Sequence, residues 1–204
     1  NISTDGYVGL YAAEDITAGS INAGHDVIAL AGDDASFGPI TTPERFILAG
    51  YGNIDQLNNG EAFDPELIFG LWPIEATGGD ATFAGSSNVF QFQAYVGGNT
   101  IVQSITATPD LSEFPELGTG GDIRIETGGT VAIAGTLTAG WISLLSSNIN
   151  IAPTAAINAS EVSFISINPV GTYIGDGLTG QDGYRLSQAE LDRVTANGLE
   201  FEIA

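Results

Sequence analysis

Short alternating pairs of apolar residues recur from Gly120 to Ser166, and small or polar residues separate one pair from the next. The same rows of apolar residues return at regular distances along the chain. The returning pairs are Ile123 and Ile142 (19 positions), Ile142 and Val162 (20), Val131 and Ile149 (18), and Leu137 and Ile157 (20). A repeat of this length, with about three short strands in each unit and no helical spacing, predicts a β-solenoid.

The first 32 residues carry the same repeat. Ile2 returns as Ile21 after 19 positions, and we match Val8 and Leu10 to Ile28 and Leu30 after 20. Crossovers between parallel strands are right-handed in nearly all proteins. We therefore predict an all-β fold over residues 1–204, a single-stranded, right-handed parallel β-helix with coils of about 18–20 residues in one domain.

Three segments interrupt this pattern. Clusters of turn-forming residues predict an insert or extra-helical loop at residues 33–79, within which Phe46–Ala49 could rejoin the stack as a strand. Smaller loops are predicted at residues 109–119 and 167–185. Inserts of this kind usually leave a solenoid from one of its faces.

The insert at residues 33–79 contains a concentrated apolar run, Leu67–Ile74, with Phe69 and Trp72. These aromatic side chains either pack back on the flank of the solenoid or form a partner-binding surface, since aromatic residues are enriched at interfaces. Phe69 and Trp72 are therefore the candidate partner-binding residues.

Close to its end the chain has the signature of one short helix. Ser187 and Glu190 have the spacing of a capping box, and Leu186 and Leu191 that of a hydrophobic staple. We predict a helix near residues 188–195, followed by an alternating strand at residues 199–203. Because the chain would then start and stop on strands without a polar cap, we expect a fragment or a unit of a longer chain.

The charge balance excludes several partners. The chain has 25 Asp and Glu against 4 basic residues, all of them Arg, and a net charge of −21. Phosphate binding needs basic residues, so a nucleic-acid partner and an anionic membrane surface are excluded. No run is long and apolar enough for membrane insertion, and the absence of cysteine excludes disulfides and thiol chemistry.

Parallel β-helices also include polysaccharide hydrolases and lyases, so an enzyme is the main alternative. Hydrolysis needs two or three convergent carboxylates, and the available groups are His25, Asp26, Asp33 and Asp34. His25 falls in a corner between coils, and Lys, a candidate base for a lyase, is absent. We therefore assign no catalytic residue and expect no enzyme activity.

Calcium is the one cofactor with any support. Residues 175–183, GDGLTGQDG, resemble a Gly-Asp calcium loop, but they lack the G-G-x-G-x-D repeat and occur once. We therefore expect no metal site and no cofactor, with Ca²⁺ as the alternative at this loop.

Rows of outward Thr residues would indicate a flat ice-binding face. Thr130, Thr136 and Thr138 are present, but Ser, Asn or Ala replaces them in the next coils. This hypothesis ranks below the enzyme.

The repeated string T-A-G-x-I (Thr17–Ile21 and Thr138–Ile142) and the string Leu186–Leu191, LSQAEL, resemble the filamentous-haemagglutinin-like family. The resemblance covers residues 1–32 and 120–204 well and residues 33–119 poorly. It implies a β-helix shaft segment of a giant exoprotein, exported by two-partner secretion to the surface of a Gram-negative bacterium or into its surroundings.

From these observations we expect a structural segment of a secreted or cell-surface filamentous adhesin, with a role in adhesion, aggregation or biofilm. The expected partners are neighbouring β-helix units or copies of the chain end to end, with surface receptors or glycans as further candidates. The alternative is a carbohydrate-active β-helix enzyme, either a polysaccharide hydrolase or a lyase.

Overall fold

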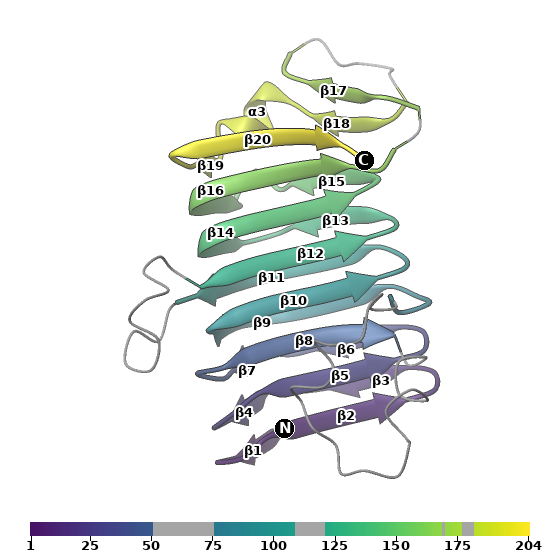
Figure 1. Cartoon of the computed structure of the whole chain (residues 1–204), viewed down its shortest axis with the longest axis vertical. Coiled ribbons are helices and arrows are strands. Elements are labelled where there is room, and N and C mark those ends of the chain that lie inside the picture. Colours follow the sequence, from purple (N-terminus) through teal and green to yellow (C-terminus); the bar gives the residue numbers. More distant parts are fainter. Residues whose placement is uncertain (51–75, 109–120, 169, 177–181) are drawn as a thin grey trace.

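The computed structural model describes residues 1–50, 76–108, 121–168, 170–176 and 182–204. Its main feature is an 18-stranded sheet in which all recorded strand pairs are parallel. The strands nearest the viewer in Figure 1 run from left to right while the chain climbs from the N-terminus, so the coil is right-handed. The predicted parallel β-helix is confirmed.

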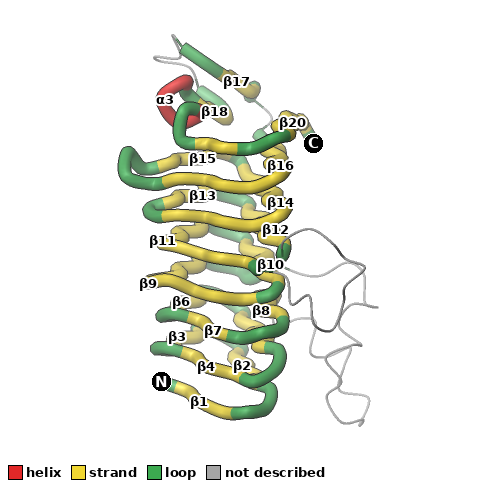
Figure 2. Tube along the Cα trace, turned by 90° about the vertical axis from the view of Figure 1, so that its left-hand side faces the viewer, coloured by secondary structure: helices red, strands yellow, loops and turns green. Residues whose placement is uncertain are grey.

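The elements follow one another in short steps, and the coils stack without crossing (Figure 2). They are β1 (Ile2–Thr4), β2 (Val8–Ala12), β3 (Ile16–Ala18), β4 (Ile21–Ala23), β5 (Val27–Ala31), β6 (Ala35–Phe37), β7 (Ile40–Thr41), β8 (Arg45–Gly50), β9 (Ala81–Val89), β10 (Gln91–Val96), β11 (Thr100–Ala107), β12 (Asp122–Thr127), β13 (Thr130–Ile133), β14 (Thr136–Ser146), β15 (Asn148–Ile151), β16 (Ala156–Ser166), β17 (Thr172–Ile174), β18 (Tyr184–Leu186), α3 (Gln188–Leu191), β19 (Val194–Thr195) and β20 (Gly198–Ile203).

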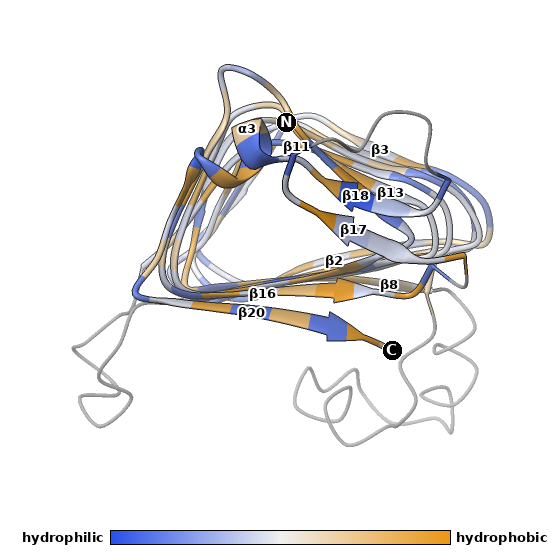
Figure 3. Ribbon diagram, turned by 90° about the horizontal axis from the view of Figure 1, so that it is seen from above, coloured by the Kyte–Doolittle hydropathy of each residue, from blue (hydrophilic) through white to orange (hydrophobic). Residues whose placement is uncertain are grey.

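The strands line three faces around one core, which gives the three-sided outline of Figure 3. We call one face the front sheet; it contains β2, β5, β8, β10, β12, the second halves of β14 and β16, and β20, paired in that order. The second face runs from β3 to β15 and the third from β1 to β19. Eight levels at about 4.8 Å make a stack of about 40 Å.

Four aromatic rings pack together in the core of the first half of the stack. The rings of Phe37, Phe46, Phe83 and Phe92 are 0–2% exposed and contact one another with centroid distances of 5.0–5.6 Å. Alternating parallel and edge-on contacts are the favoured geometry for such rings. The core is therefore closely packed from one level to the next.

The regular part of the sequence predicts the register correctly. The ladder aligns Ile123 with Ile142, Ile142 with Val162, Val131 with Ile149, and Leu137 with Ile157, as the repeat predicts. Ile2 also aligns with Ile21. These matches hold because both residues of each pair are inward and apolar.

The match of Val8 to Ile28 is wrong by one residue. Val8 aligns with Val27, so Ile28 and Leu30 lie on the outer side of the front sheet. A slip of one position moves every side chain of a strand to the opposite face. Together with Ile47 and Ala49, these two residues form a second buried cluster, separate from the core. The strands β5 and β8 are consequently buried on both faces, and alternation could not fix their register.

The insert predicted at residues 33–79 starts too early. Residues 35–50 form β6, β7 and β8, which align with β3, β4 and β5 and complete a regular coil. Turn-forming residues such as Pro39 and Pro43 lie at the corners between these strands rather than in an extruded loop. The remainder of that segment up to residue 75, and the loop predicted at 109–119, lie outside the described residues.

The ladder resumes in register beyond each of these segments. Phe46 aligns with Phe92, 46 positions later, and Phe92 with Ile123, 31 positions later. Regular coils have a spacing of 18 to 20 positions. The segments of 46 and 31 positions nevertheless each add one coil to the stack, as a regular coil does.

The C-terminal part departs from the regular coil, as predicted. The strands β17 and β18 pair only with each other, outside the main ladder. The capping box is confirmed, because the Ser187 side chain accepts a hydrogen bond from the Glu190 amide and Glu190 accepts one from the Ser187 amide. The predicted helix of 188–195 is too long: it ends at Leu191, since Val194 and Thr195 join the ladder as β19.

Candidate functional site

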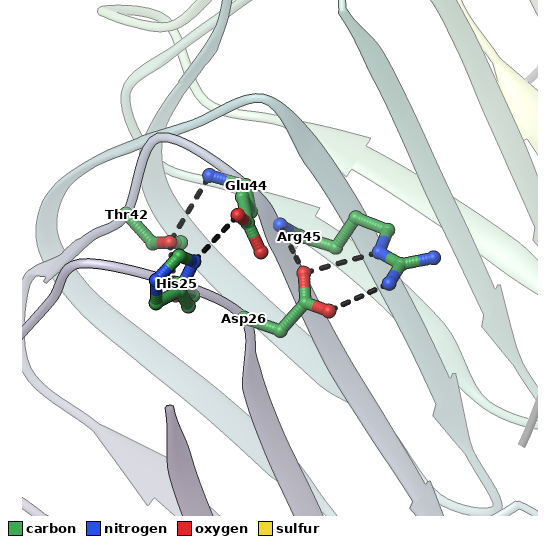
Figure 4. Close-up of polar contacts among 5 residues, drawn as sticks. All are labelled: His25, Asp26, Thr42, Glu44 and Arg45. Atoms are coloured by element: carbon green, nitrogen blue, oxygen red, sulfur yellow. Dashed lines mark hydrogen bonds and ion pairs between the residues drawn. The ribbon is translucent and has the colours of Figure 1, made fainter. Parts of the chain in front are cut away.

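A cluster of polar side chains lies where the chain turns into β5 and β8, at the edge of the front sheet. His25 and Asp26 precede β5, and Glu44 and Arg45 occupy the same positions one coil later. The offset of 19 positions stacks Glu44 on His25 and Arg45 on Asp26, as Figure 4 shows.

The Asp26 carboxylate and the Arg45 guanidinium form a two-point ion pair. Arg45 Nε donates to Asp26 Oδ1 at 3.0 Å and Nη2 to Oδ2 at 2.6 Å, while the Arg45 backbone amide also donates to Oδ1 at 2.9 Å (Figure 4). Asp26 is 2% exposed. A buried carboxylate needs such complete pairing, because its desolvation is costly. The geometry gives Asp26 a structural role in joining two coils.

The His25 imidazole and the Glu44 carboxylate form a more accessible pair. His25 Nδ1 lies 2.7 Å from Glu44 Oε1, with the two side chains 45% and 34% exposed. The ring stacks on Tyr7 at a centroid distance of 4.8 Å. Thr42 Oγ1 donates to the His25 carbonyl and accepts from the Glu44 amide, which holds the upper turn over the lower one.

A carboxylate that orients an imidazole is one part of a general-base arrangement. Nucleophilic catalysis would need a hydroxyl or thiol held against the other ring nitrogen. The Thr42 hydroxyl is instead bonded to two backbone groups. The described residues of the cluster thus form one imidazole–carboxylate pair and one buried ion pair.

Asp33 and Asp34 lie far from this cluster. They follow β5, whereas His25 and Asp26 precede it, and five extended residues span about 17 Å. The structure therefore separates His25 and Asp26 from Asp33 and Asp34 by the length of β5.

Asp34 belongs to a column of side chains at the opposite corner. Each side-chain Oδ1 accepts the backbone amide of the residue one level above. The steps are Asp15 to Asp34 (3.2 Å), Asp34 to Asp80 (2.7 Å), Asp80 to Asn99 (2.6 Å) and Asn99 to Thr130 (2.9 Å). These side-chain oxygens accept hydrogen bonds from backbone amides that the strand ladder leaves unpaired at the turn. Their role is thus to connect coils.

Glycine is required beside this column. A Cβ atom on Gly97 would lie 2.3 Å from the Thr77 carbonyl oxygen, and one on Gly128 would lie 2.3 Å from that of Gly97. Backbones that approach this closely leave no room for a side chain. The close spacing of the coils at this corner therefore requires glycine at these positions.

Two sequence hypotheses fall partly or wholly on undescribed residues. Phe69 and Trp72 lie outside the described part of the chain, as do residues 177–181 of the Gly-Asp segment. Among the residues that the structure describes, no group of three or more His, Asp or Glu side chains could hold a metal ion. The calcium alternative at residues 175–183 stays a hypothesis.

Burial raises several pKa values on the outer surface. It raises the pKa of Tyr11 to about 12 and that of the Asp122 carboxyl above its ordinary range. Burial is the main cause of the raised pKa of Tyr95; Arg124 partly opposes the rise and Glu126 adds to it. The Arg124 guanidinium carbon lies 5.9 Å from the centre of the Tyr95 ring, and its Nε donates to Glu126 at 2.6 Å.

Three comparisons with known proteins found no match. No protein-family model matches the chain, and neither curated proteins nor solved structures gave a match. In the described residues, no helix is long and apolar enough to cross a membrane.

Proposed function

We propose that this chain is a structural shaft segment of a secreted or cell-surface filamentous exoprotein of a Gram-negative bacterium. In this role it would space and present other parts of an adhesin that acts in adhesion, aggregation or biofilm formation. The proposal rests on the architecture and on the resemblance of residues 1–32 and 120–204 to filamentous-haemagglutinin-like proteins.

The observation that carries the proposal is the continuity of the ladder through all eight levels of the front sheet. The two inner rows of the front sheet that begin at Val8 and Leu10 stay apolar up to Leu199 and Phe201. At the last level, Phe201 stacks on Phe164 at 5.7 Å and is still 40% exposed, and Ile203 is 75% exposed. An exposed apolar surface of this kind can accept a further coil or unit.

The polar groups support the same proposal. Asp26 and the column from Asp15 to Asn99 direct their oxygen atoms to neighbouring coils. Such contacts between neighbouring coils stabilise a long stack. For the carbohydrate-active alternative, Asp33 and Asp34 lie together after β5, while His25 and Asp26 lie at its other end.

Surface labelling tests the location. Antibodies raised against this chain should bind intact, unpermeabilised cells or the filtered culture medium of the organism that produces it. Labelling that requires permeabilised cells, with none in the medium, would contradict the proposal.

An internal deletion tests the shaft role itself. Removing residues 142–161 takes out one coil and leaves Val162 in the place of Ile142, its partner in the ladder. The shortened chain should keep its β-type circular dichroism, and cells that carry it should keep their adhesion or aggregation. The matched control removes residues 142–151, about half a coil, and should not fold. Loss of adhesion in a folded coil deletion would show that specific groups, and not spacing, carry the function.

A further inference from the structure

The upper half of the front sheet exposes a row in which a tryptophan lies between two carboxylates. Asp122 of β12, Trp141 of β14 and Glu161 of β16 occupy aligned positions on three successive levels. Their neighbours Ile123, Ile142 and Val162 are buried in the core, so the row itself lies on the outer side. Glu161 is exposed, and Asp122 and Trp141 are partly exposed.

This row has no cationic partner among the described residues. The recorded ion pairs involve Glu44, Asp26 and Glu126, and none involves Asp122 or Glu161. The chain has no Lys and four Arg. Of these, Arg45 and Arg124 are held in ion pairs, and the Arg193 side chain donates to the Ile151 carbonyl.

A neighbouring contact on the same face combines the same types of group with a cation. One column away, Arg124 lies over the Tyr95 ring and forms an ion pair with Glu126. That arrangement combines an aromatic ring, a carboxylate and a guanidinium. The row at Trp141 has an aromatic ring and two carboxylates, but no cation is recorded with them in the described part of the chain. Tryptophan is also the aromatic residue that binds cations best.

The wider face has the matching charge. Asp122, Glu126, Glu161, Glu200 and Glu202 surround Trp141, Leu145 and Ile165, and Arg124 is the one basic group among the outward residues of these four strands. The strands form a flat sheet in Figure 3. Small ligands favour concave sites, so a flat acidic face with an aromatic centre fits a polypeptide better.

We propose that this face, from β12 to β20, docks a basic segment of another protein, with an arginine side chain over Trp141 and between Asp122 and Glu161. The guanidinium stacks on the indole and donates to the carboxylates, which a planar, delocalised cation does better than an ammonium group. Four strands of five residues cover on the order of 300 Å². That is well below the 800 Å² or so of a standard interface, so the contact is weak and sensitive to salt.

The binding test uses a defined probe, the fluorescein-labelled peptide Gly-Arg-Gly-Arg-Gly with an amidated C-terminus, measured by fluorescence anisotropy. The matched probe carries citrulline, which is neutral and nearly isosteric, in place of each arginine. The arginine peptide should bind at low ionic strength and weaken as salt is added, because screening acts over about 10 Å at 0.1 M. The citrulline peptide should not bind.

Matched variants separate this site from the general negative charge. Asp122→Asn combined with Glu161→Gln should weaken the arginine peptide at least tenfold, and Trp141→Ala about five- to thirtyfold, as expected for a partly desolvated cation–π contact. Glu14→Gln combined with Asp33→Asn removes the same charge from exposed positions at the far corner. That control should change the affinity less than twofold.

A site-specific signal completes the experiment. In a Trp72→Phe background, Trp141 is the one remaining tryptophan, and its indole N–H resonance should shift on addition of the arginine peptide. Equal binding of the citrulline peptide, an equal loss in the control double variant, or an indole resonance that does not move would each overturn the proposal. A shift caused by a neutral oligosaccharide but not by the peptide would assign the face to glycans instead.

Discussion

Truncation of Phe46 to alanine provides the most direct quantitative test of the core. Phe46 is fully buried and contacts the rings of Phe37, Phe83 and Phe92 at 5.5, 5.6 and 5.0 Å. Replacing a buried phenylalanine by alanine costs about 3–5 kcal/mol. Each aromatic pair adds about 0.5–1.5 kcal/mol beyond area burial. The coils above and below are fixed by the ladder, so the cavity cannot close, and we expect a loss of about 4–5 kcal/mol.

Urea unfolding followed by far-UV circular dichroism measures this loss, with the denaturant dependence as a check that the same unit unfolds. Ile101→Ala is the control, because Ile101 is 48% exposed and should cost less than about 1 kcal/mol. A double-mutant cycle with Phe92→Ala should give a coupling of about 0.5–1.5 kcal/mol. A Phe46→Ala loss below about 2 kcal/mol, or no coupling, would refute the account of a rigid, ring-packed core.

Three further perturbations test the polar contacts. Arg45→Ala should destabilise the fold by about 3 kcal/mol, because it leaves the Asp26 carboxylate buried with one backbone donor; Asp26→Asn should cost less, and thermal denaturation ranks the two. Ser187→Ala removes the helix cap and should cost about 1 kcal/mol in urea unfolding. Burial raises the pKa of Asp122, so its protonated form favours the folded state and its contribution to stability is lost as pH rises through the folded-state pKa. Asp122→Asn should therefore raise the melting temperature at pH 7 more than the exposed control Glu14→Gln, and the difference should vanish below the ordinary pKa of an aspartate.

The period of the coil could be predicted from the sequence because the core is narrow. Inward positions such as Ile123, Ile142 and Val162 must be apolar at each level, and the spacing between them is the coil length. The prediction of register failed where both faces of a strand are apolar. Around Ile28 and Ile47 both faces of the strands are buried, so the alternation that fixes register disappears.

The corner contacts were within reach of the sequence but were not predicted. His25 to Glu44 and Asp26 to Arg45 are both 19 positions, the coil length already known from Ile2 and Ile21. Applying the period to charged residues as well as apolar ones would have placed these pairs. The row of Asp122, Trp141 and Glu161 follows the same rule, because each residue directly precedes a member of the inward row Ile123, Ile142 and Val162.

The separation of Phe46 and Phe92 along the chain has a consequence for how such a protein can change. A step of 46 residues raises the stack by one level, as a step of 19 residues does. The entropy of closing a loop grows slowly, by about 0.6 kcal/mol for each doubling of its length. Segments of unrelated length and composition can therefore be exchanged at this corner while the coils on both sides keep their register. The ladder therefore fixes the coils on both sides of residues 51–75, and we expect this stretch of the chain to accept a grafted peptide or domain.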